Sequence, residues 1–280
     1  MSVLSAAKQV VRRGFAGRDR AVLERIRTDG DARAAAVATA VLAVADIKRQ
    51  PPASVRAIEA ARSALGRDAS PLVDGSLGAA GPFDADVTVA GACAVSKPPS
   101  QALLLYALAT RLTPASVLEL GTNIGISSAF LGAGIADAGS GGSILTLDVS
   151  PYRVRVAQAL HRELGLPAVA TRVGLFDDTI ADAVQEAAPI DMAFIDGNHQ
   201  YEPTLAYTDR IAAGAADGAL FVYDDIRWSD GMKRAWAAVC QDARFSVVID
   251  LYSMGLAVYA PAGSAGRTVT PALYSVLARS

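Results

Sequence analysis

The stretch Val117-Leu-Glu-Leu-Gly-Thr-Asn-Ile-Gly-Ile-Ser127 has the pattern of a strand, a glycine loop and the start of a helix. Its glycines, Gly121 and Gly125, lie four residues apart and do not form the G-x-G-x-x-G pattern that binds dinucleotides. A pyrophosphate cradle is therefore disfavoured. Because Gly121 has no side chain, a ligand can approach the backbone there, and Ser127 lies near the positive end of the helix, which suits a ligand carboxylate.

Acidic and aromatic residues accompany the neighbouring strands. Glu119 lies inside an apolar strand, where a carboxylate is costly unless it is paired or hydrogen-bonded. Asp148 ends the next strand, and an acid at this position can accept hydrogen bonds from both hydroxyls of a ribose. The third strand is followed by Gly174-Leu-Phe-Asp177, which offers an aromatic face and a polar group to a nucleobase. Together these residues predict a nucleoside ligand with a carboxylate-bearing tail and no phosphate, and S-adenosylmethionine fits that description.

The elements that position these residues begin near residue 100, where helical segments start to alternate with short β-rich apolar runs. This alternation is typical of βαβ units and a mainly parallel sheet. The last two strands are joined by residues 252–254 alone, too few for a parallel crossover, so an antiparallel hairpin is expected there. We predict an α/β, Rossmann-like, seven-stranded, mainly parallel sheet with a C-terminal antiparallel hairpin. The expected strands are 116–120, 143–148, 168–173, 191–195, 219–223, 245–251 and 255–259.

The first hundred residues differ in pattern from the rest of the chain. They are rich in Ala and Arg, with apolar positions at helical spacing, and predict an N-terminal helical extension. Residues 67–99 lack long periodic runs and predict a loosely structured connector. The expected parts are a helical extension with its connector at 1–99, an α/β domain at 100–262 and a tail at 263–280, with a short helix at 270–279.

The glycine-loop segment Glu119-Leu-Gly-Thr-Asn-Ile-Gly-Ile-Ser127 resembles the first motif of class I S-adenosylmethionine-dependent methyltransferases. It is most similar to the catechol and caffeoyl-CoA O-methyltransferases, which have E-[LI]-G-x-x-x-G-[YF]-S; Ile126 departs from their usual aromatic residue. The resemblance covers roughly 97–260 and implies that 100–262 is the methyltransferase domain. By this resemblance the methionine end binds at Glu119, Gly121, Asn123 and Ser127, the ribose at Asp148 and the adenine at Phe176 and Asp177, with Thr122, Gly125, Val149, Gly174 and Asp196 completing the cofactor site.

Two further segments resemble the motifs that carry the chemistry of that family. Asp196-Gly-Asn-His-Gln-Tyr201 is similar to D-x-x-K-x-x-Y, in which the Asp binds a divalent metal and the Lys is the general base. Here His199 replaces the lysine, and Tyr201 falls one residue early. Asp224 and Asp225 match D-N-x-x-W, with Asp225 in place of Asn, and would be the other metal ligands. Three carboxylates without cysteine suit Mg²⁺ or a similar hard cation.

The resemblance implies methyl transfer from S-adenosylmethionine to a hydroxyl of a small molecule such as a vicinal diol. A metal held by two acceptor oxygens would lower the pKa of the hydroxyl. His199, with an ordinary pKa of about 6.5, would take the proton near neutral pH, so His199 and Asp196 are the catalytic candidates. Trp228, Tyr201 and Arg227 are the expected acceptor contacts.

Other interpretations stay open. Asp224 and Asp225 could cap the following helix, and the turn at Asp196 could be structural. A metal-independent O- or N-methyltransferase of the same fold is one alternative function, and a non-catalytic S-adenosylmethionine-binding protein is another. His161 is expected to be a solvated surface residue.

The composition excludes several classes of partner. The 280 residues are 52% hydrophobic and 19% charged. Because 26 Lys and Arg nearly balance 28 Asp and Glu, the chain has no net positive charge that would attract nucleic acid or an anionic membrane. The apolar stretch 34–45 is too short to span a bilayer and predicts a buried helix. The first residues resemble no secretion signal, and Cys93 and Cys240 form no CxxC pair, so a cytoplasmic location and inert thiols are expected. The apolar N-terminal helices are compatible with a homodimer.

Overall fold

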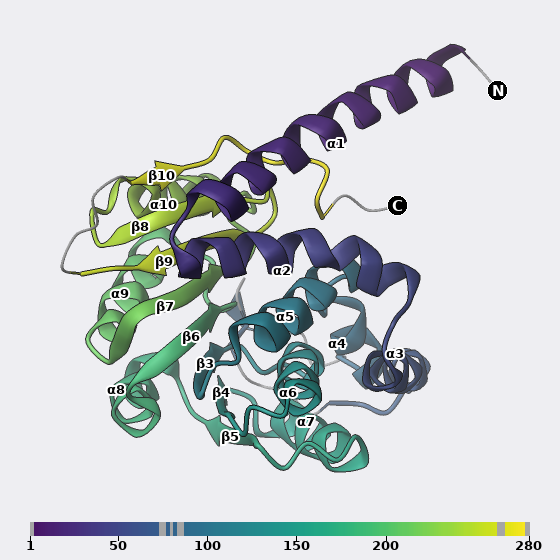
Figure 1. The fold of residues 1–280 in the computed structure, drawn as a ribbon. Coiled ribbons are helices and arrows are strands. Elements are labelled where there is room, and N and C mark those ends of the chain that lie inside the picture. Colours follow the sequence, from purple (N-terminus) through teal and green to yellow (C-terminus); the bar gives the residue numbers. More distant parts are fainter. Residues whose placement is uncertain (1–2, 73–76, 79–80, 83–86, 262–266, 278–280) are drawn as a thin grey trace.

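The computed structural model describes residues 3–72, 77–78, 81–82, 87–261 and 267–277, with side chains for 16–72, 87–261 and 267–277. It is an α/β structure in which helices cover both faces of one central sheet (Figure 1). The predicted α/β, Rossmann-like architecture is confirmed.

The central sheet has eight strands in the order β10-β8-β9-β7-β6-β3-β4-β5. Its pairs are parallel except that β9 runs antiparallel to both β7 and β8, which is the predicted C-terminal hairpin. The strands are β3 (Ser116–Leu120), β4 (Ser143–Asp148), β5 (Val169–Val173), β6 (Ile190–Ile195), β7 (Ala215–Tyr223), β8 (Phe245–Asp250), β9 (Gly255–Tyr259) and β10 (Thr268–Val269); β1 (Leu77–Gly78) and β2 (Gly81–Pro82) form a separate pair.

The helices before β3 form the N-terminal region, and most of the others connect the strands of the sheet. They are α1 (Val3–Asp29), α2 (Ala32–Arg49), α3 (Ala53–Leu65), α4 (Val89–Ala94), α5 (Pro99–Leu112), α6 (Ile126–Ala138), α7 (Pro151–Glu163), α8 (Phe176–Ala187), α9 (Tyr201–Ala212) and α10 (Asp230–Gln241). The expected buried helix at 34–45 is part of α2.

Alternate residues of the strands point into two apolar cores, one on each face of the sheet. Val117 of β3 packs with α2, α5 and α6, whereas Leu118 packs with α8, α9 and α10. The sequence order of the strands reverses at β3, between β4 and β6. Ligands of open α/β sheets bind at the carboxyl ends of the strands beside such a reversal. The loops after β3, β4, β6 and β7 are therefore the part of the fold to search for a site.

Helix α2 and the later part of α1 pack on the sheet domain rather than standing apart from it. Asp31 caps α2 by accepting a hydrogen bond from the Ala34 amide at 2.7 Å. Arg33 of α2 donates hydrogen bonds to the carbonyl oxygens of Gly218 at 2.7 Å and Asp191 at 3.1 Å. Buried Asp19 of α1 accepts hydrogen bonds from the backbone and hydroxyl of Ser275, both at 2.8 Å. Asp19 and Ser275, which lie far apart in the sequence, thus belong to one packed structure.

Three predictions about the fold are wrong. The central sheet has eight strands rather than seven, because β10, in the expected tail, pairs in parallel with β8. The expected helix at 270–279 does not form over its described residues, because the Leu273 amide donates to the Asp250 carbonyl at 2.8 Å and the Ser275 amide to Asp19, which are long-range partners. The connector at 67–99 includes α4, whose N-terminus is capped by the Thr88 hydroxyl, and the first residue of α5. Residues 73–76, 79–80 and 83–86 of that connector, and 263–266 and 278–280 of the tail, lie outside the described residues.

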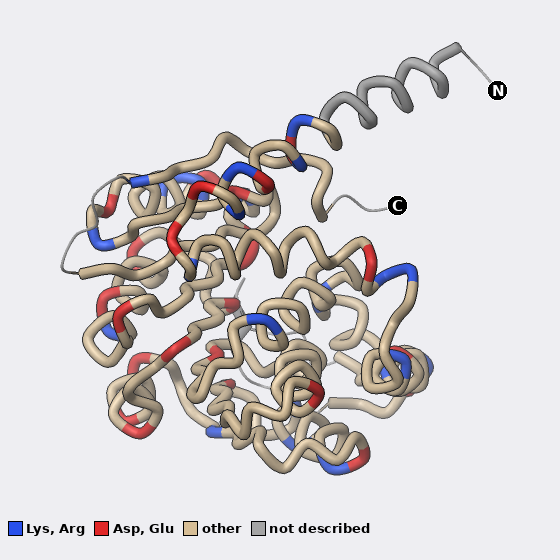
Figure 2. The backbone as a smooth tube through the Cα atoms, viewed as in Figure 1, with Lys and Arg blue, Asp and Glu red and all other residues tan. Residues whose placement is uncertain are grey.

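Figure 2 shows acidic and basic residues interspersed over the described chain, in line with the near balance of charge. Among the described helices, none combines the length and apolar character needed to cross a membrane.

Candidate active site

The loop after β3 makes a tight turn that places it against the loop after β6. Gly121 has a φ of +107°, and its amide donates to the Leu147 carbonyl at 2.9 Å. A Cβ atom on Gly121 would lie 2.2 Å from the carbonyl oxygen of Asp196. The absence of a side chain therefore allows two backbone segments to meet, whereas the sequence analysis attributed it to the approach of a ligand.

Asp148 ties the glycine loop to the end of β4. Its carboxylate accepts hydrogen bonds from the amides of Asn123 at 2.7 Å and Ser150 at 2.9 Å. The Asn123 side chain is also engaged, donating to the Ala92 carbonyl at 3.0 Å and accepting from Arg153 at 3.1 Å. The loop is thus connected to α4 as well as to β4, and Asp148 stays 9% exposed at its edge.

Glu119 lies fully buried in β3. Neither of its carboxylate oxygens has a hydrogen-bond partner among the described residues. Burial raises the pKa of Glu119 to about 7, and the neighbouring Ser127 hydroxyl acts in the opposite direction. Thr122, by contrast, turns into the protein and shares a hydrogen bond of 2.7 Å with Thr146. Buried acceptors without partners need a donor, and Glu119 therefore has unused capacity for a ligand.

The adenine candidates lie at the start of α8. Gly174 has a φ of +153°, and Phe176 meets Tyr207 edge to face, with 5.7 Å between ring centroids. A Cβ atom on Gly197 would lie 2.3 Å from the Phe176 ring, so this ring lies against the loop that carries Asp196. Asp177 is exposed and forms an ion pair with Arg210 at 2.9 Å. Half-buried Val149 directly follows Asp148.

The acidic residues after β6 and β7 come together with His199. Nε2 of His199 lies 3.6 Å from Asp196 Oδ1 and 4.0 Å from Asp225 Oδ2. Asp196, His199 and Asp224 each offer one ligand atom within 4.8 Å of the others, as in a metal site. The backbone of Asp225, which also lies at the cluster, has the left-handed conformation, with a φ of +49°.

Lys97 is part of this cluster, although the sequence analysis did not select it. Its Nζ donates to Asp196 Oδ1 at 2.9 Å and to Asp224 Oδ2. No sequence motif links Lys97 to the cluster, because it lies 99 positions before Asp196 in the connector between α4 and α5. The prolines that follow at 98 and 99 were the only nearby signal, and they indicate a turn rather than a function.

Burial and charge shift the pKa values across the cluster. Burial, followed by the neighbouring Asp196 carboxylate, raises the pKa of Asp224 to about 7. Burial also raises the pKa of Asp196 and of Asp225, and it lowers the pKa of His199. For Lys97, burial favours the neutral amine, but the Asp196 and Asp224 carboxylates outweigh it and raise the pKa. The cluster therefore contains an ammonium, carboxyl groups whose ionised forms are disfavoured by burial, and an imidazole that favours its neutral form.

The three predicted acceptor contacts differ in how freely they can reach a ligand. Both terminal nitrogens of Arg227 are bound to the Asp250 carboxylate, at 2.8 and 2.7 Å. Trp228 is 71% exposed. The Arg234 guanidinium lies over the ring of Tyr201, 4.8 Å from the ring centroid. Their contact with an acceptor stays a prediction.

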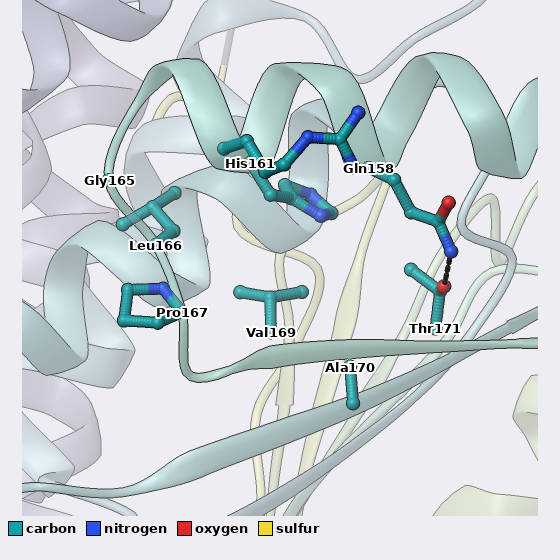
Figure 3. A pocket seen from close by; sticks show the side chains of 9 residues that line it. Gln158, His161, Gly165, Leu166, Pro167, Val169, Ala170 and Thr171 are labelled. Atoms are coloured by element: carbon teal, nitrogen blue, oxygen red, sulfur yellow. Dashed lines mark hydrogen bonds between the residues drawn. The ribbon is translucent and has the colours of Figure 1, made fainter.

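One cavity lies at the glycine loop, and a larger one lies on another part of the domain. A small one of about 20 Å³ lies between Val95, Ser96 and Lys97 on one side and the glycine loop and Asp196 on the other. A larger one of about 610 Å³ lies between α7 and β5 and is lined by His161, Leu166 and Thr171 (Figure 3). The carboxylate cluster does not line the larger cavity.

His161 is 3% exposed, and the expectation of a solvated residue is wrong. Its Nε2 lies 3.0 Å from the Ser128 hydroxyl and 3.3 Å from the Gly125 carbonyl, and a Cβ atom on Gly125 would be 2.8 Å from that nitrogen. His161 thus supports the glycine loop from α7. Burial lowers its pKa to about 4.

His161 should make the stability of the fold depend on pH. The folded state holds the imidazole neutral, so its contribution is complete above the unfolded pKa of about 6.5 and is lost as the pH falls toward 4. Relative to His161→Gln, which has no titrating group there, the wild type should lose about 2 kcal/mol between about pH 7.5 and pH 5. Urea unfolding of both proteins at the two pH values measures this difference, and an equal pH dependence would contradict it.

Comparison with known proteins agrees with this geometry. Residues 118–226 match the family model of a methyltransferase domain. A catechol O-methyltransferase from Niastella koreensis is 32% identical over 139 residues, which make up 49% of this chain and 61% of that protein. The chain therefore covers about three fifths of the length of this relative.

Solved structures share the fold. The cofactor-bound protein Rv0187 from MTB is 25% identical, with a TM-score of 0.53 over 59% of this chain and 82% of that chain. An O-methyltransferase from Bacillus cereus in complex with SAH has a TM-score of 0.55 at 18% identity and covers 80% of this chain and 99% of that chain. These matches support the resemblance indicated by the glycine-loop motif: residues 118–226 match a methyltransferase domain, and the chain has the fold of the solved O-methyltransferase structure.

Proposed function

We propose that the protein transfers a methyl group from S-adenosylmethionine to a hydroxyl oxygen of a small molecule. The observation that carries the proposal is the meeting of the glycine loop with the cluster of Asp196, His199, Asp224 and Asp225 at the carboxyl ends of β3, β6 and β7. In this proposal the glycine loop binds the cofactor and His199 accepts the proton, and the two lie side by side. Methyl transfer requires this arrangement, because the methyl group of the cofactor must be aligned with the acceptor oxygen.

The cofactor would extend from Glu119 to Phe176 along these strand ends. Glu119, with two buried acceptor oxygens and no partner among the described residues, suits the methionine ammonium, and Ser127 at the start of α6 suits the methionine carboxylate. Asp148 would accept from the ribose hydroxyls, and Phe176 would contact the adenine. The remaining proposed contacts are Gly121, Thr122, Asn123, Gly125, Val149, Gly174, Asp177 and Asp196.

His199 is the proposed general base. It is neutral at physiological pH because burial lowers its pKa, so Nε2 can take the proton of the acceptor hydroxyl as the methyl group is transferred. Asp196, 3.6 Å from that nitrogen, would stabilise the imidazolium that results. Tyr201, Arg227 and Trp228 are the proposed acceptor contacts at the rim.

A divalent cation such as Mg²⁺ is compatible with the donor atoms of the cluster. Asp196 and Asp224 provide hard oxygen ligands, and Oδ1 of Asp224 is buried without a partner among the described residues. Asp196 and Asp224 would hold the ion, with Asp225 beside them. When bound, it would lower the pKa of a coordinated acceptor hydroxyl.

Metal-independent methyl transfer is a second candidate, and one observation favours it. Lys97 already places a cation against Asp196 and Asp224. An ammonium at this point can orient an acceptor oxygen without a metal ion, in which case a chelator would leave turnover unchanged.

The finer predictions about the whole protein also remain proposals. These are the division into 1–99, 100–262 and 263–280, a homodimer, the lack of nucleic acid or membrane partners and a cytoplasmic location. The free thiols of Cys93 and Cys240 support a reducing compartment.

Calorimetric titration tests the proposed function on purified, chelator-treated protein. S-adenosylmethionine is expected to bind with micromolar affinity, and mass spectrometry should detect a methylated product when a catechol is added. The assay is then repeated with Mg²⁺ to separate the two candidates. Absence of cofactor binding under every condition would contradict the proposal.

A further inference from the structure

The Lys97 ammonium occupies the position between the two carboxylates on which a metal ion would depend. Its Nζ contacts Asp196 and Asp224 at the same time, and its side chain is 11% exposed. Both carboxylates belong to the group that could hold a metal ion. The geometry points to Lys97 as the built-in counter-ion of this site, which a divalent cation must displace in order to bind.

Lys97 is held at the site by its surroundings. It lies directly before Pro98 and the start of α5, and the Asn123 side chain donates to the Ala92 carbonyl of α4 at 3.0 Å. The segment 95–97 thus lies over the glycine loop, with only about 20 Å³ of space beneath it. The contact of Lys97 with the carboxylates is therefore part of a packed arrangement rather than a chance position of a long surface side chain.

A metal ion and the ammonium would exclude one another. Mg²⁺ binds carboxylate oxygens at about 2.0 to 2.1 Å and Mn²⁺ prefers the same oxygen donors, so an ion shared by Asp196 and Asp224 would lie within a few ångströms of Lys97 Nζ. Two cations at that separation repel each other strongly in a buried site. Metal binding therefore requires Lys97 to leave, and the free energy of its contacts weakens the affinity for the metal.

This inference rests on the proposed use of Asp196 and Asp224 as metal ligands, and it does not depend on methyl transfer. According to this inference, Lys97 sets the affinity of Asp196 and Asp224 for a divalent cation. The wild type binds the cation weakly, and loss of the ammonium makes the same carboxylates a stronger metal site.

The experiment measures Mn²⁺ binding by calorimetry in the absence of S-adenosylmethionine. Wild type, Lys97→Met, Lys97→Gln and the double variant Lys97→Met/Asp224→Asn are compared. The Lys97 variants should bind Mn²⁺ at least about tenfold more tightly than the wild type, and the double variant should lose that gain. Equal affinity in the wild type and the Lys97 variants, or no Mn²⁺ binding by any of them, would overturn the inference.

A second measurement uses the wild type alone and so does not depend on the folding of a variant. An amine-acylating reagent is applied with and without saturating Mn²⁺, and the labelled lysines are quantified by mass spectrometry. Acylation of Lys97 should rise when Mn²⁺ binds, while exposed Lys48 and Lys233 stay constant. Unchanged protection of Lys97 in the Mn²⁺-bound protein would contradict displacement. Titration of the same samples with S-adenosylmethionine tests the proposed function separately.

Discussion

Replacing His199 by alanine is expected to lower kcat for methyl transfer by roughly 10² to 10⁴, the usual contribution of a general base. His199 is the imidazole in contact range of Asp196 and Asp225, and burial keeps it neutral and able to accept a proton. The affinity for S-adenosylmethionine should change little, because the proposed cofactor contacts lie mainly on other strands. Steady-state kinetics and calorimetry on the same preparation measure the two quantities.

The matched control is Gln200→Ala, which removes an exposed side chain next to His199 in the chain. It should keep near wild-type turnover. If His199→Ala lowers kcat by less than about tenfold, or if cofactor affinity falls in parallel with kcat, His199 is not the base.

Asp148→Ala is expected to weaken binding of S-adenosylmethionine by about 1 to 3 kcal/mol, or roughly 5- to 150-fold in Kd. The carboxylate would lose its proposed contact with the ribose and also its hydrogen bond to the Asn123 amide, which holds the glycine loop. Calorimetric titration gives the change directly, and thermal unfolding shows whether the loop contact also contributes to stability.

Asp182→Ala is the control for Asp148, because Asp182 is an exposed carboxylate on α8 outside the proposed site. Its affinity for the cofactor should equal that of the wild type. Unchanged affinity in Asp148→Ala would remove Asp148 from the ribose site, whatever the effect on folding.

Features that depend on local pattern were accessible from the amino-acid sequence. The strands 116–120, 143–148 and 255–259 have the predicted bounds, because alternating short apolar runs and glycine turns are local signals. The order of acidic residues at successive strand ends indicated where the loops would converge, since parallel strands bring their carboxyl ends to one edge of the sheet. The α/β fold followed from these signals, whereas the grouping of Asp196, His199 and Asp224 was implied by the resemblance to the motifs of the O-methyltransferases.

Features that depend on contacts between distant segments were not accessible in this way. Lys97 reaches Asp196 only because α4 packs against the glycine loop, and His161 is buried only because α7 packs beneath Gly125. The residues after β10 bond to Asp250 and Asp19 rather than forming a helix. Burial, ion pairing and pKa values depend on the neighbours that folding brings together, and no periodicity along the chain records those neighbours.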